Sequence, residues 1–163
     1  SEIKQGRIDG VITQNIDGLH QFAGSHRVWE LHGTARQIGC LQCQARFEAD
    51  PLVRQYLDRG VVPDCERCGG LLKHATISFG QSLPAEVLGE SARLSRQVDL
   101  FLAIGSSLVV YPAAGLPEAA KESGAKLVII TRDPTPLDRL ADVVINAEIG
   151  PTLTAIDGML GDR

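Results

Sequence analysis

The sequence predicts an α/β fold, a partial doubly wound parallel sheet into which a small cysteine-bearing module is inserted. Three observations predict it. Short apolar runs alternate with helix-length segments, as strands and crossover helices do. The runs are continuously apolar rather than alternating, which favours parallel strands buried on both faces. All four cysteines fall in one stretch that breaks this rhythm.

Four apolar runs are predicted to be strands. Each is short and rich in Val, Ile or Leu, and the runs occupy residues 10–14, 98–104, 126–131 and 142–146. Helices are predicted at 84–97, 112–123 and 151–160. Each helix opens at a proline, which is tolerated in a first turn, and the second ends before Gly124, a plausible cap.

The cysteines form two C-x2-C pairs, Cys40/Cys43 and Cys65/Cys68. The intervening 21 residues, 44–64, put the gap one residue beyond the usual zinc-ribbon range of up to about 20. Two such hairpins can supply four thiolates to a tetrahedral zinc site, which is structural because no position stays open. Two disulfides or four free thiols are the alternatives, and disulfides are disfavoured because the sequence shows no secretory signal.

Composition excludes several classes of protein. With 44% apolar residues the chain can bury a core, so general disorder is not expected. The 20 acidic residues outnumber the 16 basic ones, so no nucleic-acid partner is expected. No apolar run is long enough to span a membrane, so no membrane partner is expected either. We expect a cytoplasmic protein.

Polar loops follow three of the predicted strands. In doubly wound sheets ligands bind beyond the carboxyl ends of the strands, so these loops predict a cofactor crevice. Glycine lets a backbone approach a phosphate, serine hydroxyls can donate to it, and an acidic side chain can accept from a ribose. Each loop also fits an ordinary turn or helix cap. The candidate residues are Gln14, Asn15 and Asp17, then Gly105, Ser106 and Ser107, then Thr131 and Asp133.

His32 is the candidate general base. An imidazole titrates near neutrality, which suits proton transfer. The alternative is a structural histidine, and the chain has four histidines.

The ordered set of motifs resembles the sirtuins, the NAD-dependent protein deacylases. The resemblance runs from about Gly10 to Leu160. Its motifs lie at residues 13–20, 30–33, the two cysteine pairs, 78–81, 105–112 and 131–135.

The resemblance implies a Rossmann-like NAD-binding domain at 1–33 and 75–163, lacking its N-terminal strands, and a zinc-binding module at 34–74. It implies transfer of the acyl group of an acyl-lysine protein or peptide to ADP-ribose. In the family the acyl oxygen attacks C1′ of the nicotinamide ribose, nicotinamide leaves, and a histidine base then activates a ribose hydroxyl.

Residue roles follow from the same resemblance. His32, Asn15 and Asp17 are the implied catalytic residues, and the polar strand-end residues named above are the implied NAD contacts. An extended substrate would lie between two segments, with Phe79 packing on the lysine stem and the Ile77 carbonyl accepting from the substrate nitrogen. The implied substrate-binding residues are Ile77, Phe79, Gly80, Val109, Val110 and Tyr111.

This chain departs from the family pattern in several places. Gln81, Thr131 and Asp133 stand where the family commonly has Glu, Asn and Glu. No Gly-Ala-Gly-x-Ser motif precedes Thr13, and residues 1–9 resemble the end of a helix. We therefore expect a C-terminal portion of a sirtuin with an incomplete NAD site. A partner or an N-terminal segment would cover the exposed sheet edge.

Two other functions stay open at this point. One is an NAD-consuming enzyme with a different outcome, ADP-ribosyl transfer or NAD hydrolysis. The other is a non-catalytic zinc-bearing interaction module.

Overall fold

A computed structural model describes residues 8–161, and the predicted helix end at residues 1–9 lies mostly outside them. The chain divides into two compact units, the first ending at Leu88 and the second beginning at Gly89. We treat each unit by itself. None of the described helices is long and apolar enough to cross a membrane.

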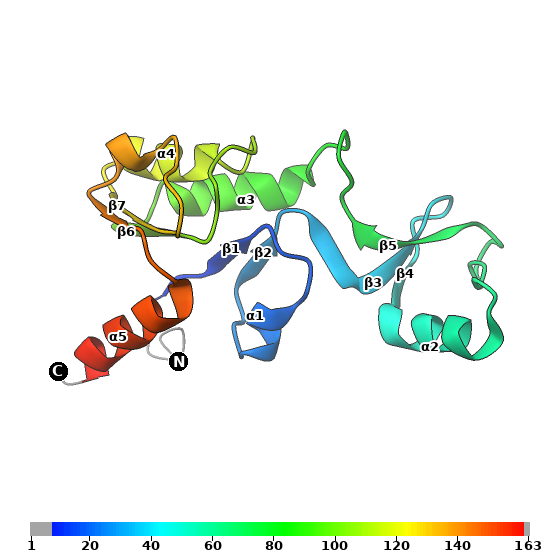
Figure 1. The fold of residues 1–163 in the computed structure, drawn as a ribbon. Helices are drawn as coiled ribbons and strands as arrows, with labels where there is room; N and C mark the ends of the chain where they lie inside the picture. The colour runs from blue at the N-terminus through cyan, green and yellow to red at the C-terminus, as the bar shows by residue number, and fades with distance from the viewer. Residues whose placement is uncertain (1–7, 162–163) are drawn as a thin grey trace. The chain divides into compact units, whose positions relative to one another are not determined.

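The first unit contains two sheets. Its elements in chain order are β1 (Val11–Thr13), α1 (Leu19–Phe22), β2 (Val28–Glu30), β3 (Gly33–Cys40), β4 (Arg46–Glu48), α2 (Ala49–Arg59) and β5 (Leu72–Thr76). Strands β1 and β2 pair in parallel. Strands β4, β3 and β5 form an antiparallel sheet in that order. Helix α2 packs against β3, as Figure 1 shows.

The antiparallel sheet has its own small core. Ile38 of β3 is buried together with Ala49 and Leu52 of α2. A second cluster buries Ala45 with Cys40 and Cys65. Only a few buried apolar side chains of the sheet and helix therefore hold the cysteine-bearing hairpins in place.

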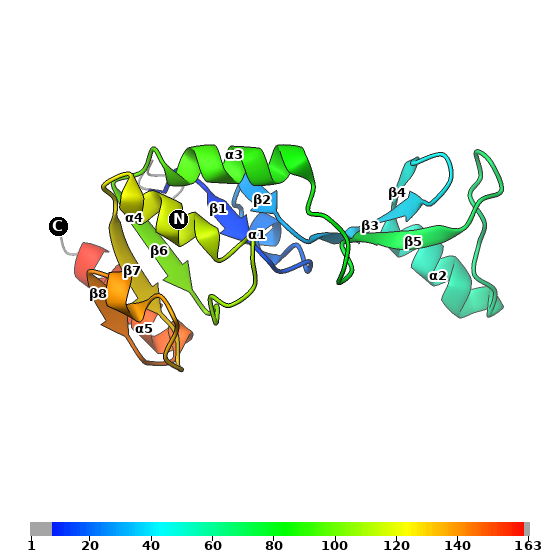
Figure 2. The same ribbon diagram turned by 90° about the horizontal axis from the view of Figure 1, so that it is seen from above.

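The second unit is built on a parallel sheet. Helix α3 (Ala85–Ser95) spans the unit boundary, and after it come β6 (Leu100–Ile104), α4 (Gly115–Glu122), β7 (Lys126–Ile130), the 3-10 turn η1 (Asp138–Leu140), β8 (Val143–Ile145) and α5 (Ile149–Gly161). The strand order is β6-β7-β8, and α4 packs on β6 and β7 (Figure 2). All four predicted strands and three predicted helices are therefore confirmed, with ends shifted by a few residues.

The expectation that the apolar strands are buried on both faces is correct for β7 and wrong for β6 and for β8, in which Val143 is 48% exposed. Leu127, Ile129 and Ile130 of β7 are fully buried. Leu100 and Leu102 of β6 are 52% and 43% exposed, and they lie on one face because strand side chains alternate. A continuous apolar run shows that both faces are apolar, but not that this chain covers both.

Candidate active site and metal centre

Residues Gln14 and His32 meet at the carboxyl edge of the β1–β2 pair. Thr13 is opposite Glu30 at the strand ends, and the Leu31 amide donates to the Thr13 carbonyl at 2.9 Å. Two parallel strands that end in register place the residues after them side by side. The sequence-predicted histidine therefore lies against the sequence-predicted loop.

The imidazole of His32 is oriented by one hydrogen bond. Its Nδ1 lies 3.0 Å from the carbonyl oxygen of Gln14. A carbonyl can only accept, so Nδ1 carries the proton. In the neutral ring Nε2 then holds the free electron pair, and the half-buried side chain is set up to accept a proton there.

The loop after β1 is held by its own turn chemistry. The Asn15 amide donates to Thr13 Oγ1 at 3.1 Å, and the Leu19 amide donates to Asp17 Oδ1 at 2.9 Å. The second contact is an Asx turn, one of the alternatives that the sequence left open. The exposed Asn15 side chain makes no polar contact within residues 8–161, so it is available to a ligand.

Arg36 was not among the predicted site residues, yet it fixes this loop. Its Nε donates to the Asp17 carbonyl at 3.1 Å, and its guanidinium lies 5.1 Å from the Phe22 ring centroid. The Ala35 amide also donates to the Ile16 carbonyl at 2.8 Å. No sequence motif marks Arg36, because its partners are 14 to 19 residues away along the chain.

The predicted substrate segment begins beside His32. The Ile77 amide donates to the His32 carbonyl at 2.8 Å. A tight turn follows, in which the Gln81 side-chain oxygen accepts from the Ser78 amide at 2.8 Å. Phe79 is fully exposed, so its ring does not belong to the apolar core.

Gly33 makes this arrangement possible. Its φ is +71°, and a Cβ there would lie 2.1 Å from the Ala75 carbonyl oxygen. Only glycine lets the start of β3 pass so close to β5. The motif at residues 30–33 contains this glycine, but the sequence does not show its role.

In the second unit, two of the predicted loops share one edge of the sheet. Ile104 is opposite Ile130, so Gly105 and Thr131 follow strands that end in register. Gly105 has φ +65°, and its amide donates to the Ile130 carbonyl at 2.9 Å. The Leu108 amide donates to Ser106 Oγ at 3.2 Å, the plain turn that the sequence also allowed.

The other residues at this edge differ in accessibility. Ser107 and Asp133 are exposed, whereas the Thr131 side chain is buried. Asn146, which directly follows β8, donates from Nδ2 to the Thr131 carbonyl at 3.3 Å. The sequence prediction placed Asn146 inside the strand and missed this contact; its place at a strand end was the available signal.

Residues 109–111 are all accessible. Val109, Val110 and Tyr111 are 58%, 43% and 61% exposed. The Tyr111 hydroxyl donates to Glu118 Oε2 at 3.0 Å, and this hydrogen bond raises the pKa of the phenol. These side chains are therefore not part of the core of the second unit.

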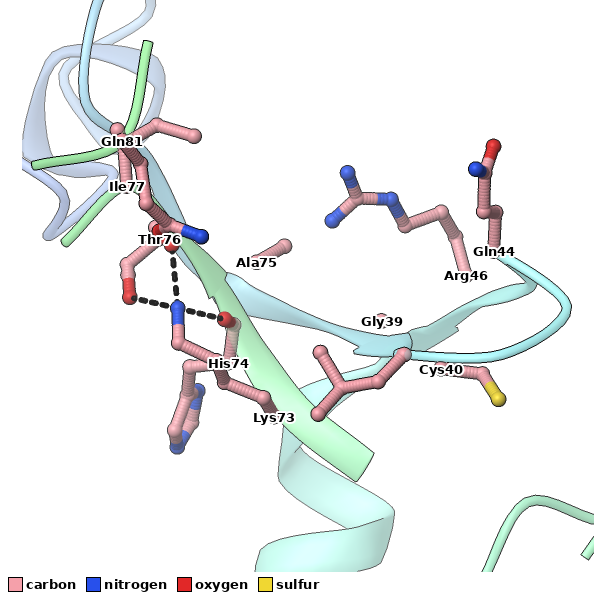
Figure 3. Close-up of a pocket in the computed structure, with 11 residues that line it drawn as sticks. Gly39, Cys40, Gln44, Arg46, Lys73, His74, Ala75, Thr76, Ile77 and Gln81 are labelled. Carbon is pink, nitrogen blue, oxygen red and sulfur yellow. Dashed lines mark hydrogen bonds between the residues drawn. The ribbon is translucent and has the colours of Figure 1, made fainter. Parts of the chain in front are cut away.

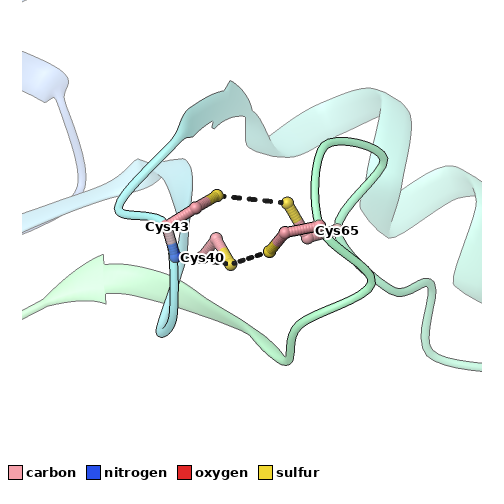
Figure 4. Close-up of side chains that lie close together, drawn as sticks. Cys40, Cys43 and Cys65 are labelled. Carbon is pink, nitrogen blue, oxygen red and sulfur yellow. Dashed lines mark hydrogen bonds between the residues drawn. The ribbon is translucent and has the colours of Figure 1, made fainter.

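The four cysteines converge at the end of the antiparallel sheet. Their sulfur atoms all lie within 4.8 Å of one another, and none forms a disulfide. The Cys40 and Cys68 sulfurs are 3.5 Å apart, and those of Cys43 and Cys65 are 3.7 Å apart (Figure 4). Four sulfur donors at these separations fit a tetrahedral structural zinc ion.

Neighbouring thiols help to shift the pKa values of Cys40 and Cys68. The Cys43 amide donates to Cys40, and this contact is the main reason that the pKa of Cys40 falls to about 6. The Gly70 amide lowers the pKa of Cys68, but the neighbouring sulfurs outweigh it and raise that pKa to about 12. A divalent cation removes this conflict, because it stabilises all four thiolates together.

Parallel sheets with polar loops at their carboxyl edges are typical of α/β ligand-binding proteins, and the four clustered cysteines fit a metal-binding module. A model of the Sir2 family matches residues 2–112. A protein from Rhodopseudomonas palustris described as an NAD-dependent protein deacetylase is 49% identical over 92% of this chain. An NAD-dependent protein deacetylase 2 from Streptomyces coelicolor is 50% identical over 93%. The chain therefore belongs to the Sir2 family.

Solved structures agree with this assignment. The structure titled "Sir2-p53 peptide-NAD+" superimposes with a TM-score of 0.92 at 38% identity, covering 99% of this chain and 67% of that one. A Sir2 complex with 2'-O-acetyl-ADP-ribose and a deacetylated p53 peptide gives 0.89. The chain spans 60% of the Rhodopseudomonas relative and 64% of the Streptomyces relative.

Proposed function

We propose that the protein containing this chain is an NAD-dependent protein lysine deacylase. It would transfer the acyl group of an acyl-lysine to ADP-ribose and release nicotinamide. The observation that carries the proposal is the His32–Gln14 hydrogen bond, which leaves Nε2 as the proton acceptor. The deacetylase relatives and the Sir2 complexes with NAD and peptide support the substrates.

In this proposal each group of residues has one task. His32 removes the proton from a ribose hydroxyl. Asn15 and Asp17 belong to the pocket for nicotinamide and its ribose, and Gln14 contacts a ribose. Phosphate and adenosine-ribose contacts come from Gly105, Ser106, Ser107, Thr131 and Asp133. Substrate contacts come from Ile77, Phe79, Gly80, Val109, Val110 and Tyr111. The structural zinc is bound by Cys40, Cys43, Cys65 and Cys68.

The division of the chain is part of the proposal. Residues 34–74 would be the zinc-binding module, and 1–33 with 75–163 the Rossmann-like NAD-binding domain. The change from parallel to antiparallel pairing at β3 supports this division. The exposed face of the edge strand β6 supports the expectation that further polypeptide covers it. We also propose that the protein is cytoplasmic.

One assay separates this function from its competitors. The protein expressed from its complete gene is incubated with NAD and an acetyl-lysine peptide. We expect free lysine peptide, nicotinamide and O-acetyl-ADP-ribose in equal amounts by mass spectrometry. Nicotinamide release without deacylation would instead indicate ADP-ribosyl transfer or NAD hydrolysis, and no NAD turnover would indicate an interaction module.

A further inference from the structure

A hollow lies on one face of the β4–β3–β5 sheet. Its volume is about 320 Å3, at the lower end of the range typical of ligand pockets. Gly39 of β3, Arg46 of β4 and Lys73 of β5 contribute to its lining, and so do Ile77 and Gln81 (Figure 3). The lining also includes Cys40 and Leu41, so the hollow borders the first cysteine pair, whereas His32 is not part of it.

The register of the three strands explains the hollow. Gly39 is directly opposite Arg46 on one side and Lys73 on the other. Residues directly opposite in antiparallel strands point to the same face, so both long side chains start beside a residue that has none. A Cβ on Gly39 would lie 3.1 Å from Arg46 Nη1, so the guanidinium occupies the space above this glycine.

The lining is positively charged. It contains Arg46 and Lys73 and no carboxylate. Within residues 8–161 the Arg46 side chain makes no ion pair or hydrogen bond. The Lys73 ammonium donates only to neutral oxygens, the Thr76 carbonyl at 2.5 Å, the Thr76 hydroxyl at 3.5 Å and the His74 carbonyl at 3.4 Å. Both charges therefore lack an acidic partner.

The position of the hollow points to its ligand. Ile77 and Gln81 bound the proposed substrate segment, and the Ile77 amide is tied to His32. An extended peptide held by that segment would pass the hollow with the residues that flank its acyl-lysine. A guanidinium binds a carboxylate through two parallel hydrogen bonds, and an ammonium adds a point charge.

We propose that this hollow binds an acidic side chain that flanks the acyl-lysine of the protein substrate. The inference rests on the proposed function, because it needs an acyl-lysine peptide on the 77–81 segment. It makes Arg46 and Lys73 determinants of substrate choice rather than catalytic residues.

The test compares matched peptides. Pairs of fluorescent acetyl-lysine peptides differ only in Glu or Gln at one flanking position, and the position is moved along the peptide. Anisotropy is measured with the protein expressed from its complete gene. At one or two positions we expect the Glu peptide to bind about 3- to 10-fold tighter, with the preference shrinking as salt increases.

Three variants test whether Arg46 and Lys73 cause the preference for the Glu peptide. Arg46→Gln and Lys73→Met should each reduce it towards equal binding of the two peptides, while binding of the Gln peptide stays unchanged. Arg54→Gln, which removes the same charge from an exposed position on α2, should leave the preference intact. Zinc content is measured for each variant and should stay at the wild-type value.

Each other outcome counts against the proposal in a distinct way. Equal binding of Glu and Gln peptides at every position overturns the inference but not the deacylase function. So does an Arg46→Gln variant that loses zinc and weakens both peptides alike, since Arg46 would then serve the cysteine centre. If neither peptide binds or is deacylated, the proposed function fails, and the inference fails with it.

Discussion

The backbone amide of Ile77 donates a hydrogen bond to the carbonyl oxygen of His32, with a distance of 2.8 Å. The imidazole of the same histidine is held by the Gln14 carbonyl at 3.0 Å. His32 is therefore fixed at both its main chain and its side chain. The proposed base and the start of the proposed substrate segment form one hydrogen-bonded piece, so displacement of one will displace the other.

His32→Ala should reduce deacylation by about 100-fold or more, because it removes the proton acceptor. Initial rates with an acetyl-lysine peptide and NAD measure the effect. His26→Ala is the matched control, since His26 is exposed and belongs to no proposed site. A His32→Ala protein that keeps the wild-type rate contradicts the assigned role.

Gly33→Ala should cost more stability than Gly60→Ala. Both glycines have φ near +70°, where an alanine costs about 1–2 kcal/mol. A Cβ at Gly33 also meets the Ala75 carbonyl, whereas nothing lies within 4 Å of one at Gly60. We expect about 1–3 kcal/mol of additional loss for Gly33→Ala in urea unfolding. Equal losses would show that the close approach of β3 and β5 is unimportant.

The wild-type protein should contain about one zinc ion per chain. Cys40→Ser should purify with much less zinc than that. The variant keeps only three thiolates, and it should also unfold at lower temperature. Leu41→Ala is the control, because Leu41 lies in the same hairpin but its side chain is 62% exposed. Metal analysis and differential scanning fluorimetry provide the two measurements. Freshly purified wild type without zinc would refute the assignment.

Asp142 should stabilise the second unit in a pH-dependent way. Lys121 Nζ donates to its carboxylate at 2.5 Å, the Leu127 amide at 2.9 Å and Lys126 Nζ at 3.0 Å. These contacts hold the pKa of Asp142 well below its usual range. The stabilisation is therefore present above the unfolded-state pKa of about 3.9 and is lost as pH falls towards the folded-state value.

Asp142→Asn should accordingly lower the urea midpoint at pH 7. The difference from the wild type should shrink as pH falls below about 4, where the Asp142 carboxylate of the unfolded chain begins to be protonated while that of the folded chain stays ionised. Asp99→Asn removes a charge from an exposed residue and should change the midpoint little at any pH. A constant difference across this pH range would rule out the ionised carboxylate as the cause.

The fold was predictable from the sequence where one local signal was sufficient. Continuous runs such as Lys126–Ile130 gave the strands, and proline and Gly124 gave approximate helix limits. The three-residue strand β2 was missed because Val28–Glu30 is too short to show a period. Strands β3, β4 and β5 were missed because their stability comes from pairing with one another and from the cysteine centre.

The candidate site was predictable where the type of residue by itself indicates the chemistry. Cysteine spacing indicated the metal centre, and the polar residues after each predicted strand indicated the loops at Gly105 and Thr131. Arg36 could not be found this way, because its contacts join segments that are distant in sequence. Asn146 was missed because the predicted strand included it, although it directly follows β8 in the structure. The Arg46–Gly39–Lys73 row is likewise a product of strand register, which a single sequence does not specify.

Strand β3 begins at Gly33, next to His32, and ends at Cys40. Side chains of a strand alternate between faces, so one residue added or removed here would turn Cys40 and its neighbours to the opposite face. The connection between Cys43 and Cys65 has the same constraint in β4, but the loop after α2, residues 60–64, contains no strand. Length changes should thus be tolerated in that loop and rejected between the histidine and the first cysteine, which tells an engineer where this chain can accept an insertion.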